Sequence, residues 1–249
     1  MDFQGILSDA FSYTKEGILG NTNRWLKLII AILCLGLPFN GYVMRVYRGA
    51  NPAPEVDGWG ALFIDGLKLF AVGLVYALPL VIIWMFIFGT MLLSGFSDDA
   101  SGAGIAAAGM NLLLMMVMYL YEIVIAVLMP IASIRFARTN SFAEAFNFSG
   151  IFGTIGRIGW LNYIIAIILV GLVVGIPMMV LIFGFIIVAI IIGGVSMVLL
   201  KEAGLLVLFG LIALMLLAII ILAPLFGIFQ ARCMTRVYDC AAPAEPAPL

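Results

Sequence analysis

The sequence predicts an all-α protein, a polytopic transmembrane helical bundle of about six membrane segments with interfacial amphipathic helices; five segments is the alternative count. Hydrophobic residues make up 65% of the 249 residues and charged residues only 10%. A water-soluble fold would therefore lack the polar side chains to cover its surface. Several uncharged runs also reach the roughly 20 residues that cross about 30 Å of hydrocarbon.

Residues 1–23 are predicted to form an amphipathic helix that lies in the membrane interface. Phe3, Leu7 and Phe11 can share one face of this helix. A cleaved secretory signal is not expected, because the stretch begins with an acid and has no continuous apolar core. The alternative is a loosely ordered terminus.

Residues 24–236 contain the predicted bundle. Its spans are assigned to residues 25–47, 67–93, 111–134, two within 158–200, and 203–229. Pro38 is expected to kink the first span. The charge-free run 158–200 is too long for one straight crossing, so we predict a break at Gly175 and Pro177. A disordered Pro/Ala tail is expected at residues 237–249.

The basic residues near the span ends set the predicted orientation. With six spans, seven of the 12 lysines and arginines share one side, among them Arg135 and Lys201, against five that include Arg24 and Arg232. Five spans would give eight against four, because Arg232 and Arg236 would join the larger set and Lys201 would leave it. Six spans are retained, because a lipid-exposed re-entrant segment would leave backbone groups without hydrogen bonds.

Two segments, near residues 55–67 and 141–155, are predicted to be interfacial elbows. Each follows an Arg-x-x-Arg pair, in MRVYRG and in IRFARTN, and each is aromatic and amphipathic. We interpret this pattern as a weak internal repeat that places both segments on the same side of the membrane. In the first elbow, Asp57 is the expected helix cap, and Trp59 and Phe63 are expected in the headgroup layer.

The paired arginines, Arg45 with Arg48 and Arg135 with Arg138, allow two interpretations. They can be ordinary anchors on the positive side of the membrane. They can also bind lipid phosphates, because guanidinium groups three residues apart lie on one helical face. Lys68 is expected at the same headgroup level, where it can form a surface ion pair with the acid three residues before it.

Four stretches carry a family resemblance: GYVMRVYRG, PEVDGWGALFIDGLKLF, VYALP, and RFA with the following FAEAFNF. They are similar to those of an uncharacterised, mainly archaeal family of membrane proteins, domain of unknown function 4013. The resemblance covers roughly residues 1–229 and is most specific in the first half. It extends distantly to the membrane domains attached to some glycerophosphodiester phosphodiesterases, whose catalytic barrel has no counterpart here. It implies a polytopic fold and no hydrolytic residue.

Glu122 is an acid in the middle of a predicted span, where an ionised carboxylate costs a few kcal/mol unless it is paired. Spacings of eleven residues put Asn111, Glu122 and Ser133 on one helical face, in a stripe otherwise filled by methionine and alanine. One interpretation is a proton or cation relay. The other is a protonated Glu122 that bonds to a neighbouring helix and holds the bundle together.

The sequence contains no recognisable catalytic, metal-binding or cofactor-binding motif. It has no histidine, and its three cysteines lack the paired spacing of a disulfide framework or a zinc site. Asp98 and Asp99 supply too few ligands for a divalent cation. We therefore expect a protein that is not an enzyme and that uses no cofactor.

The expected function is that of a multi-pass protein of the cell membrane that organises lipid or a partner membrane protein. Membrane lipids are the expected partners, together with another membrane protein or a second copy of the chain. Nucleic acid is not expected, because the formal net charge is -1. The alternative is a small secondary transporter or channel that uses Glu122, with helices broken at Pro38, Pro177 and Pro224 around a midplane cavity.

Overall fold

The computed structural model describes residues 1–95 and 102–241, and this part of the chain is helical without any strand. The predicted all-α class is therefore confirmed. In chain order the helices are α1 Phe3–Thr14, the π-helical η1 Lys15–Leu19, α2 Thr22–Leu33, α3 Leu37–Tyr47, α4 Trp59–Gly95, α5 Gly102–Thr139, the 3-10 helix η2 Phe142–Ala145, α6 Phe148–Ile158, α7 Trp160–Val188, the π-helical η3 Ala189–Gly193, α8 Gly194–Leu200 and α9 Glu202–Asp239.

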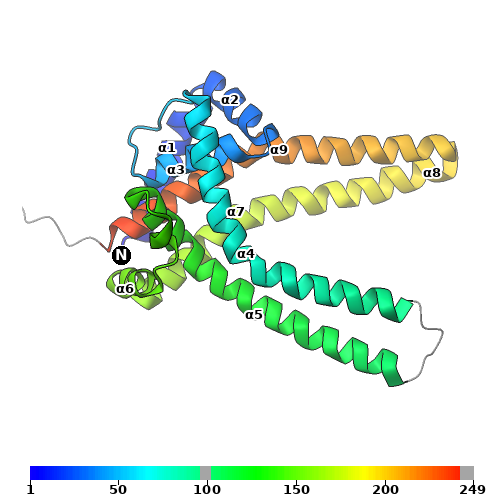
Figure 1. Ribbon diagram of the computed structural model, residues 1–249. Helices are drawn as coiled ribbons and strands as arrows, with labels where there is room; N and C mark the ends of the chain where they lie inside the picture. The colour runs from blue at the N-terminus through cyan, green and yellow to red at the C-terminus, as the bar shows by residue number, and fades with distance from the viewer. Residues whose placement is uncertain (96–101, 242–249) are drawn as a thin grey trace, which may run out of the picture.

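These helices form a head and two helical hairpin arms (Figure 1). Arm 1 consists of the outer parts of α4 and α5, and arm 2 consists of α7 and α8 packed against α9. The hydrophobic core lies in the head, where Tyr42, Phe136 and Tyr163 are among the largest fully buried side chains. We define the head, which holds every residue of this core cluster, as 1–78, 128–170 and 224–241, arm 1 as 79–95 with 102–127, and arm 2 as 171–223.

Within the described residues, four helical stretches are long and apolar enough to cross a membrane. They are Trp59–Leu92, Ala107–Thr139, Trp160–Leu200 and Glu202–Asp239. The arms expose large apolar side chains along most of their length, as a surface in contact with lipid does. The chain is therefore a membrane protein, and its described residues contain four helices of membrane-spanning length, against about six segments predicted from the sequence.

The first difference concerns the predicted span 25–47, which the structure divides into α2 and α3. At 12 and 11 residues, these helices are each about 18 Å long or less, too short to cross the hydrocarbon. The chain turns at Leu35 and Gly36, whose φ angles are 60° and 69°. Pro38 lies in the first turn of α3, where its missing N–H is not needed, so it starts a helix instead of kinking one.

The second difference concerns the predicted break at Gly175 and Pro177, which is absent. α7 runs through Pro177, η3 and α8 continue the helical path to Leu200, and the hairpin turns at Lys201 with φ 50° and ψ -118°. A proline removes one hydrogen bond from a helix. A turn in hydrocarbon would leave several backbone groups unpaired, so the continuous helix is favoured.

Proline residues mark the places where the arms leave the head. Pro79 lies in α4, Pro130 in α5 and Pro224 in α9, and Figure 1 shows α4 changing direction between the head and arm 1. At each site, an aromatic donor from another helix bonds to the carbonyl oxygen three residues before the proline. These bonds are Tyr121 to Tyr76 at 3.0 Å, Tyr163 to Val127 at 2.6 Å, and Trp25 to Ile221 at 2.9 Å.

We call these three sites the proline junctions. A proline ring opens the helix next to it, and in membrane proteins the freed backbone groups are satisfied by neighbouring helices. The donors come from α5, α7 and α2, so each junction also joins the bent helix to a second helix. Among the described residues, the carbonyl of Val174 before Pro177 accepts no such side-chain bond.

Two glycines bring α3 and α4 into direct backbone contact. A Cβ atom on Gly41 would lie 1.9 Å from the carbonyl oxygen of Leu62, and one on Gly66 would lie 1.7 Å from that of Leu37. Only a residue without a side chain fits at either position. The inner face of the first half of α4 is therefore fixed to α3, while its outer face stays exposed.

The predicted elbow at 55–67 is part of a longer helix. α4 begins at Trp59 and continues without interruption to Gly95, so the chain does not break near Leu67. The change of direction expected between elbow and span occurs instead beyond the elbow, where α4 leaves the head for arm 1 (Figure 1). The second predicted elbow is formed by η2 and α6, which are separate from α7.

The first and the last of the described residues lie in the head. α1 and η1 occupy most of the predicted N-terminal helix 1–23, and α1 packs against α9. α9 continues to Asp239, beyond the start of the predicted tail at residue 237. The remainder of that tail from residue 242, like Asp98 and Asp99, lies outside the described residues.

Candidate functional site: the arginines of the head

The two Arg-x-x-Arg pairs meet in the head. Arg48 Nε donates to the carbonyl oxygen of Ala137, and Arg138 Nε donates to the carbonyl oxygen of Tyr47, both at 3.1 Å. The second arginine of each pair thus bonds to the residue that precedes the second arginine of the other pair. This reciprocal contact relates the ends of α3 and α5 as two copies of one unit, a structural counterpart of the predicted repeat.

All four of these arginines also form ion pairs with acids. The pairs are Arg45 with Asp57 at 2.7 Å, Arg48 with Asp65 at 2.6 Å, Arg135 with Glu144, and Arg138 with Asp239 at 2.5 Å. In each copy, the first arginine binds an acid of the segment that follows it. Asp57 and Asp65, expected to cap a helix and to pair with Lys68, therefore bind arginines.

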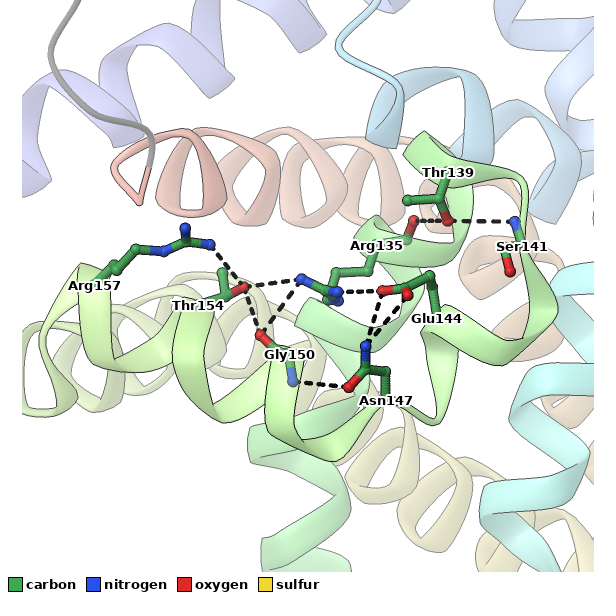
Figure 2. Close-up of polar contacts among 8 residues, drawn as sticks. All are labelled: Arg135, Thr139, Ser141, Glu144, Asn147, Gly150, Thr154 and Arg157. Carbon is green, nitrogen blue, oxygen red and sulfur yellow. Dashed lines mark hydrogen bonds and ion pairs between the residues drawn. The ribbon is translucent and has the colours of Figure 1, made fainter.

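Figure 2 shows how Arg135 holds the second elbow. Its guanidinium group bonds to Glu144 and lies 3.3 Å from Thr154 Oγ1 and 3.4 Å from the carbonyl oxygen of Gly150. Asn147 caps α6 by accepting a 2.9 Å bond from Gly150 N–H, and its amide donates to Glu144. One arginine from α5 thus fixes both η2 and the first turns of α6.

A third helix end carries arginines that the sequence analysis did not assign to a site. Arg232 Nε donates to Asp9 at 2.7 Å, and Arg236 Nη2 donates to the same carboxylate at 2.9 Å. The Arg232 guanidinium also lies 4.4 Å from the centre of the Tyr13 ring. Two arginines four residues apart share a helical face. The sequence signals that could have indicated this site are that spacing and the presence of an acid on an amphipathic N-terminal helix.

The contact between Arg138 and Asp239 bears directly on the number of spans. The ion pair joins the end of α5 to the end of α9. The six-span arrangement placed these two helix ends on opposite sides of the membrane, whereas the structure brings them together. The five-span alternative placed the arginines of α9 with Arg135 and Arg138, and the structure agrees with that part of it.

The acids of these pairs outside the membrane-length helices have lowered pKa values. Burial raises the pKa of Asp9, but the hydrogen bond and charge of Arg232 outweigh it and hold that pKa below 3.8. The hydrogen bond from Arg45 lowers the pKa of Asp57, and bonds from Asn147 and then Arg135 lower that of Glu144. Each carboxyl group is therefore ionised at neutral pH.

Arginines and lysines are used differently in the described part of the chain. Every arginine there except Arg157 forms an ion pair with an acid, and no lysine does. Arg157 is exposed on α6, as are Phe148 and Phe152, and Trp160 is exposed at the start of α7. The rings of Phe152 and Trp160 stack with centroids 5.9 Å apart. This surface combines a cation with aromatic side chains, as interfacial helices do.

The residues predicted for the first elbow lie on the outer side of α4. Trp59 and Phe63 are 38% and 43% exposed, and Lys68 is exposed one turn further along. No side chain of this group takes part in the arginine network. Their predicted contact with lipid headgroups remains a prediction, which the exposure permits.

The predicted polar stripe of α5 is divided among three environments. Asn111 accepts a 2.6 Å bond from Thr90 Oγ1 and so links the two helices of arm 1. Ser133 is 4% exposed and lines a groove in the head. Glu122 is exposed on arm 1, and no hydrogen bond joins it to another described residue. The described residues thus give no support to a bond that ties Glu122 to a neighbouring helix.

Among the described residues, no three metal-ligating side chains are grouped to hold a metal ion. The chain matches the family described as Protein of unknown function (DUF4013) over residues 26–186, which is more than half of its length. The chain belongs to this family. The resemblance to domain of unknown function 4013 is therefore confirmed. No curated protein and no solved structure matches the chain.

The DUF4013 match covers part of the arginine network. It includes both Arg-x-x-Arg pairs and the acids Asp57, Asp65 and Glu144. Asp9 and the arginines of α9 lie outside it. The match is also shorter than residues 1–229, over which the sequence resemblance was assigned. The third arginine-bearing helix end is thus a feature of this chain beyond the matched region.

Proposed function

We propose that this DUF4013 protein is a multi-pass, non-enzymatic protein of the cell membrane whose head organises lipid, with the two arms crossing the bilayer. The observation that carries this proposal is the distribution of charge. All but one of the 12 lysines and arginines belong to the head, and the exception, Lys201, lies at the tip of arm 2. The positive-inside rule then places the head on the cytoplasmic side.

This charge asymmetry is stronger than the one assigned from the sequence, because the basic residues near α1 and those at the end of α9 belong to the same side. With the arms across the bilayer, the first half of α4 runs roughly across the arm direction and so along the membrane surface (Figure 1). Trp59 and Phe63 then lie in the headgroup layer, as the elbow interpretation requires. The paired arginines hold the head together, so lipid contact is assigned to Arg157, the head lysines and the exposed aromatic residues.

Cysteine accessibility tests the arrangement of the arms. Cys34, Cys233 and Cys240 are first replaced, and single cysteines are then introduced at Ser8, Ser141 or Glu202. A membrane-impermeant thiol reagent should label Ser8→Cys and Ser141→Cys from one side and Glu202→Cys only from the other. Labelling of Ser141→Cys and Glu202→Cys from the same side would refute the two-hairpin arrangement.

Tryptophan quenching tests the position of the head, with Trp84 of arm 1 as an internal control. Trp160 and Trp84 are 49% and 55% exposed, so both are accessible to lipid. In single-tryptophan proteins, lipids brominated near the headgroup should quench Trp160 most, whereas deeper bromines should quench Trp84 most. Equal depth for the two residues would contradict an interfacial head.

A further inference from the structure

A groove of about 400 Å³ lies where α5, α7 and α9 leave the head, next to the end of α3. Its walls are mainly apolar and include Met129 and Val170, and no charged residue lines it. Three uncharged polar side chains also line it: Tyr47, Ser133 and Gln230. They come from α3, α5 and α9, three helices that are distant in the sequence.

These polar groups have unused hydrogen-bonding capacity. None of the three side chains bonds to another described residue. Ser133 is only 4% exposed as a residue, and its hydroxyl is open to an occupant of the groove that it lines. Burial raises the pKa of Tyr47 to about 12, so its hydroxyl remains a neutral donor. An occupant of the groove with hydrogen-bonding atoms would remove the cost of leaving these groups without partners.

We infer that the groove binds the polar end of an uncharged lipid that carries hydroxyl and ester oxygens, as diacylglycerols do. The inference rests on the proposed function, because only arms that cross the bilayer open the groove to hydrocarbon. A charged headgroup is disfavoured, because no lining residue can neutralise it. The oxygens of a neutral lipid can bond to Tyr47, Ser133 and Gln230, while its chains lie along the apolar arms.

Gly171 offers a way to fill the groove without moving the backbone. It lines the groove, and a Cβ atom added there would meet no other atom within 4 Å. Gly175, one turn further along α7, is equally open but does not line the groove. Gly171→Leu and Gly175→Leu are therefore a matched pair, of which only the first should obstruct a ligand.

The test uses a photoactivatable diacylglycerol in vesicles that contain the full-length protein. Mass spectrometry measures the label on the peptides that line the groove. We expect Gly171→Leu to reduce this label by about fivefold and Ser133→Ala combined with Gln230→Ala by about tenfold. Gly175→Leu should match the wild-type protein. A photoactivatable phosphatidylglycerol, which differs by its charged headgroup, serves as the comparison lipid.

Two results would overturn the inference. One is equal labelling of the groove in the wild-type and Gly171→Leu proteins. The other is labelling by phosphatidylglycerol that equals labelling by diacylglycerol, which would indicate general lipid contact. Cysteine accessibility of the same variants separates this failure from that of the proposed function. If the arms cross the bilayer but the groove is not labelled, only the groove assignment is wrong.

Discussion

Tyr163→Phe tests whether the aromatic donors stabilise the helices at the proline junctions. Tyr163 is fully buried, and its hydroxyl donates at 2.6 Å to the carbonyl oxygen of Val127, three residues before Pro130. The substitution removes the donor, leaves the ring in place and creates almost no cavity. Hydrogen bonds between membrane helices contribute about 0.6 kcal/mol on average and about 1.7 kcal/mol at most.

We expect a cost within that range, because the substitution removes a bond that joins α7 to α5 in a dry environment. Unfolding by SDS in mixed micelles, followed by tryptophan fluorescence, measures the change in the free energy of unfolding. The control is Tyr119→Phe, because Tyr119 is 59% exposed and bonds to no described residue. It should change the free energy of unfolding by less than about 0.5 kcal/mol.

The decisive comparison is made in a Pro130→Ala background. Alanine restores the N–H that bonds to the carbonyl oxygen of Ala126 and removes the proline ring, so this turn of α5 should depend less on the bond from Tyr163. Tyr163→Phe should then cost less than half of its original value, and a double-mutant cycle gives the difference as a coupling energy. An equal cost in both backgrounds would refute the link between the donor and the proline.

Three further predictions concern the head and arm 1. Gly66→Ala should lower the free energy of unfolding by about 1–3 kcal/mol or more, because its Cβ would lie 1.7 Å from a backbone oxygen. Gly60→Ala is the control and should be neutral, because its Cβ would meet no atom within 4 Å. Equal melting temperatures for the two variants would contradict the α3–α4 contact. The folded-state pKa of Asp9 is below 3.8, so its contribution to stability is present above that pH and is lost as the pH falls further. Asp9→Asn should remove this part of the acid sensitivity measured between pH 5 and 3, and an unchanged pH profile would count against the pairing with Arg232. Glu122→Gln should change the free energy of unfolding by less than about 0.5 kcal/mol, because Glu122 is exposed and bonds to no described residue. A proton flux in vesicles that disappears in this variant, with stability intact, would instead support the transporter alternative.

The Arg-x-x-Arg repeat shows what a local sequence pattern can and cannot predict. The sequence placed both pairs at helix ends and on the same side of the membrane, because arginine is costly in hydrocarbon and its spacing defines a face. It did not predict that Arg48 and Arg138 would bond to each other's helix. That contact depends on where α3 and α5 meet, which the periodicity of either helix does not predict.

The prolines show the opposite case, in which a local rule misled. Pro177 and Pro38 were expected to break and to kink a span, from their effect on an isolated helix. In the structure, Pro177 stays inside α7 and Pro38 starts α3. Pro224, noted in the sequence only as a possible break, has a partner in Trp25 instead. Whether a proline ends or bends a helix depended on the donors and helices around it.

The sequence by itself determined the membrane class, the helical fold and the family, because apolar content and residue spacing act locally. Lipid requires backbone groups to bond within their own segment, and that requirement can be read from any long uncharged run. Tertiary structure decided the number of membrane-length helices and the assembly of the head. Asp9 with Arg232, and Arg138 with Asp239, join residues far apart in the chain. Such contacts exist only once the helices have packed, because their energy depends on three-dimensional proximity and not on neighbouring sequence.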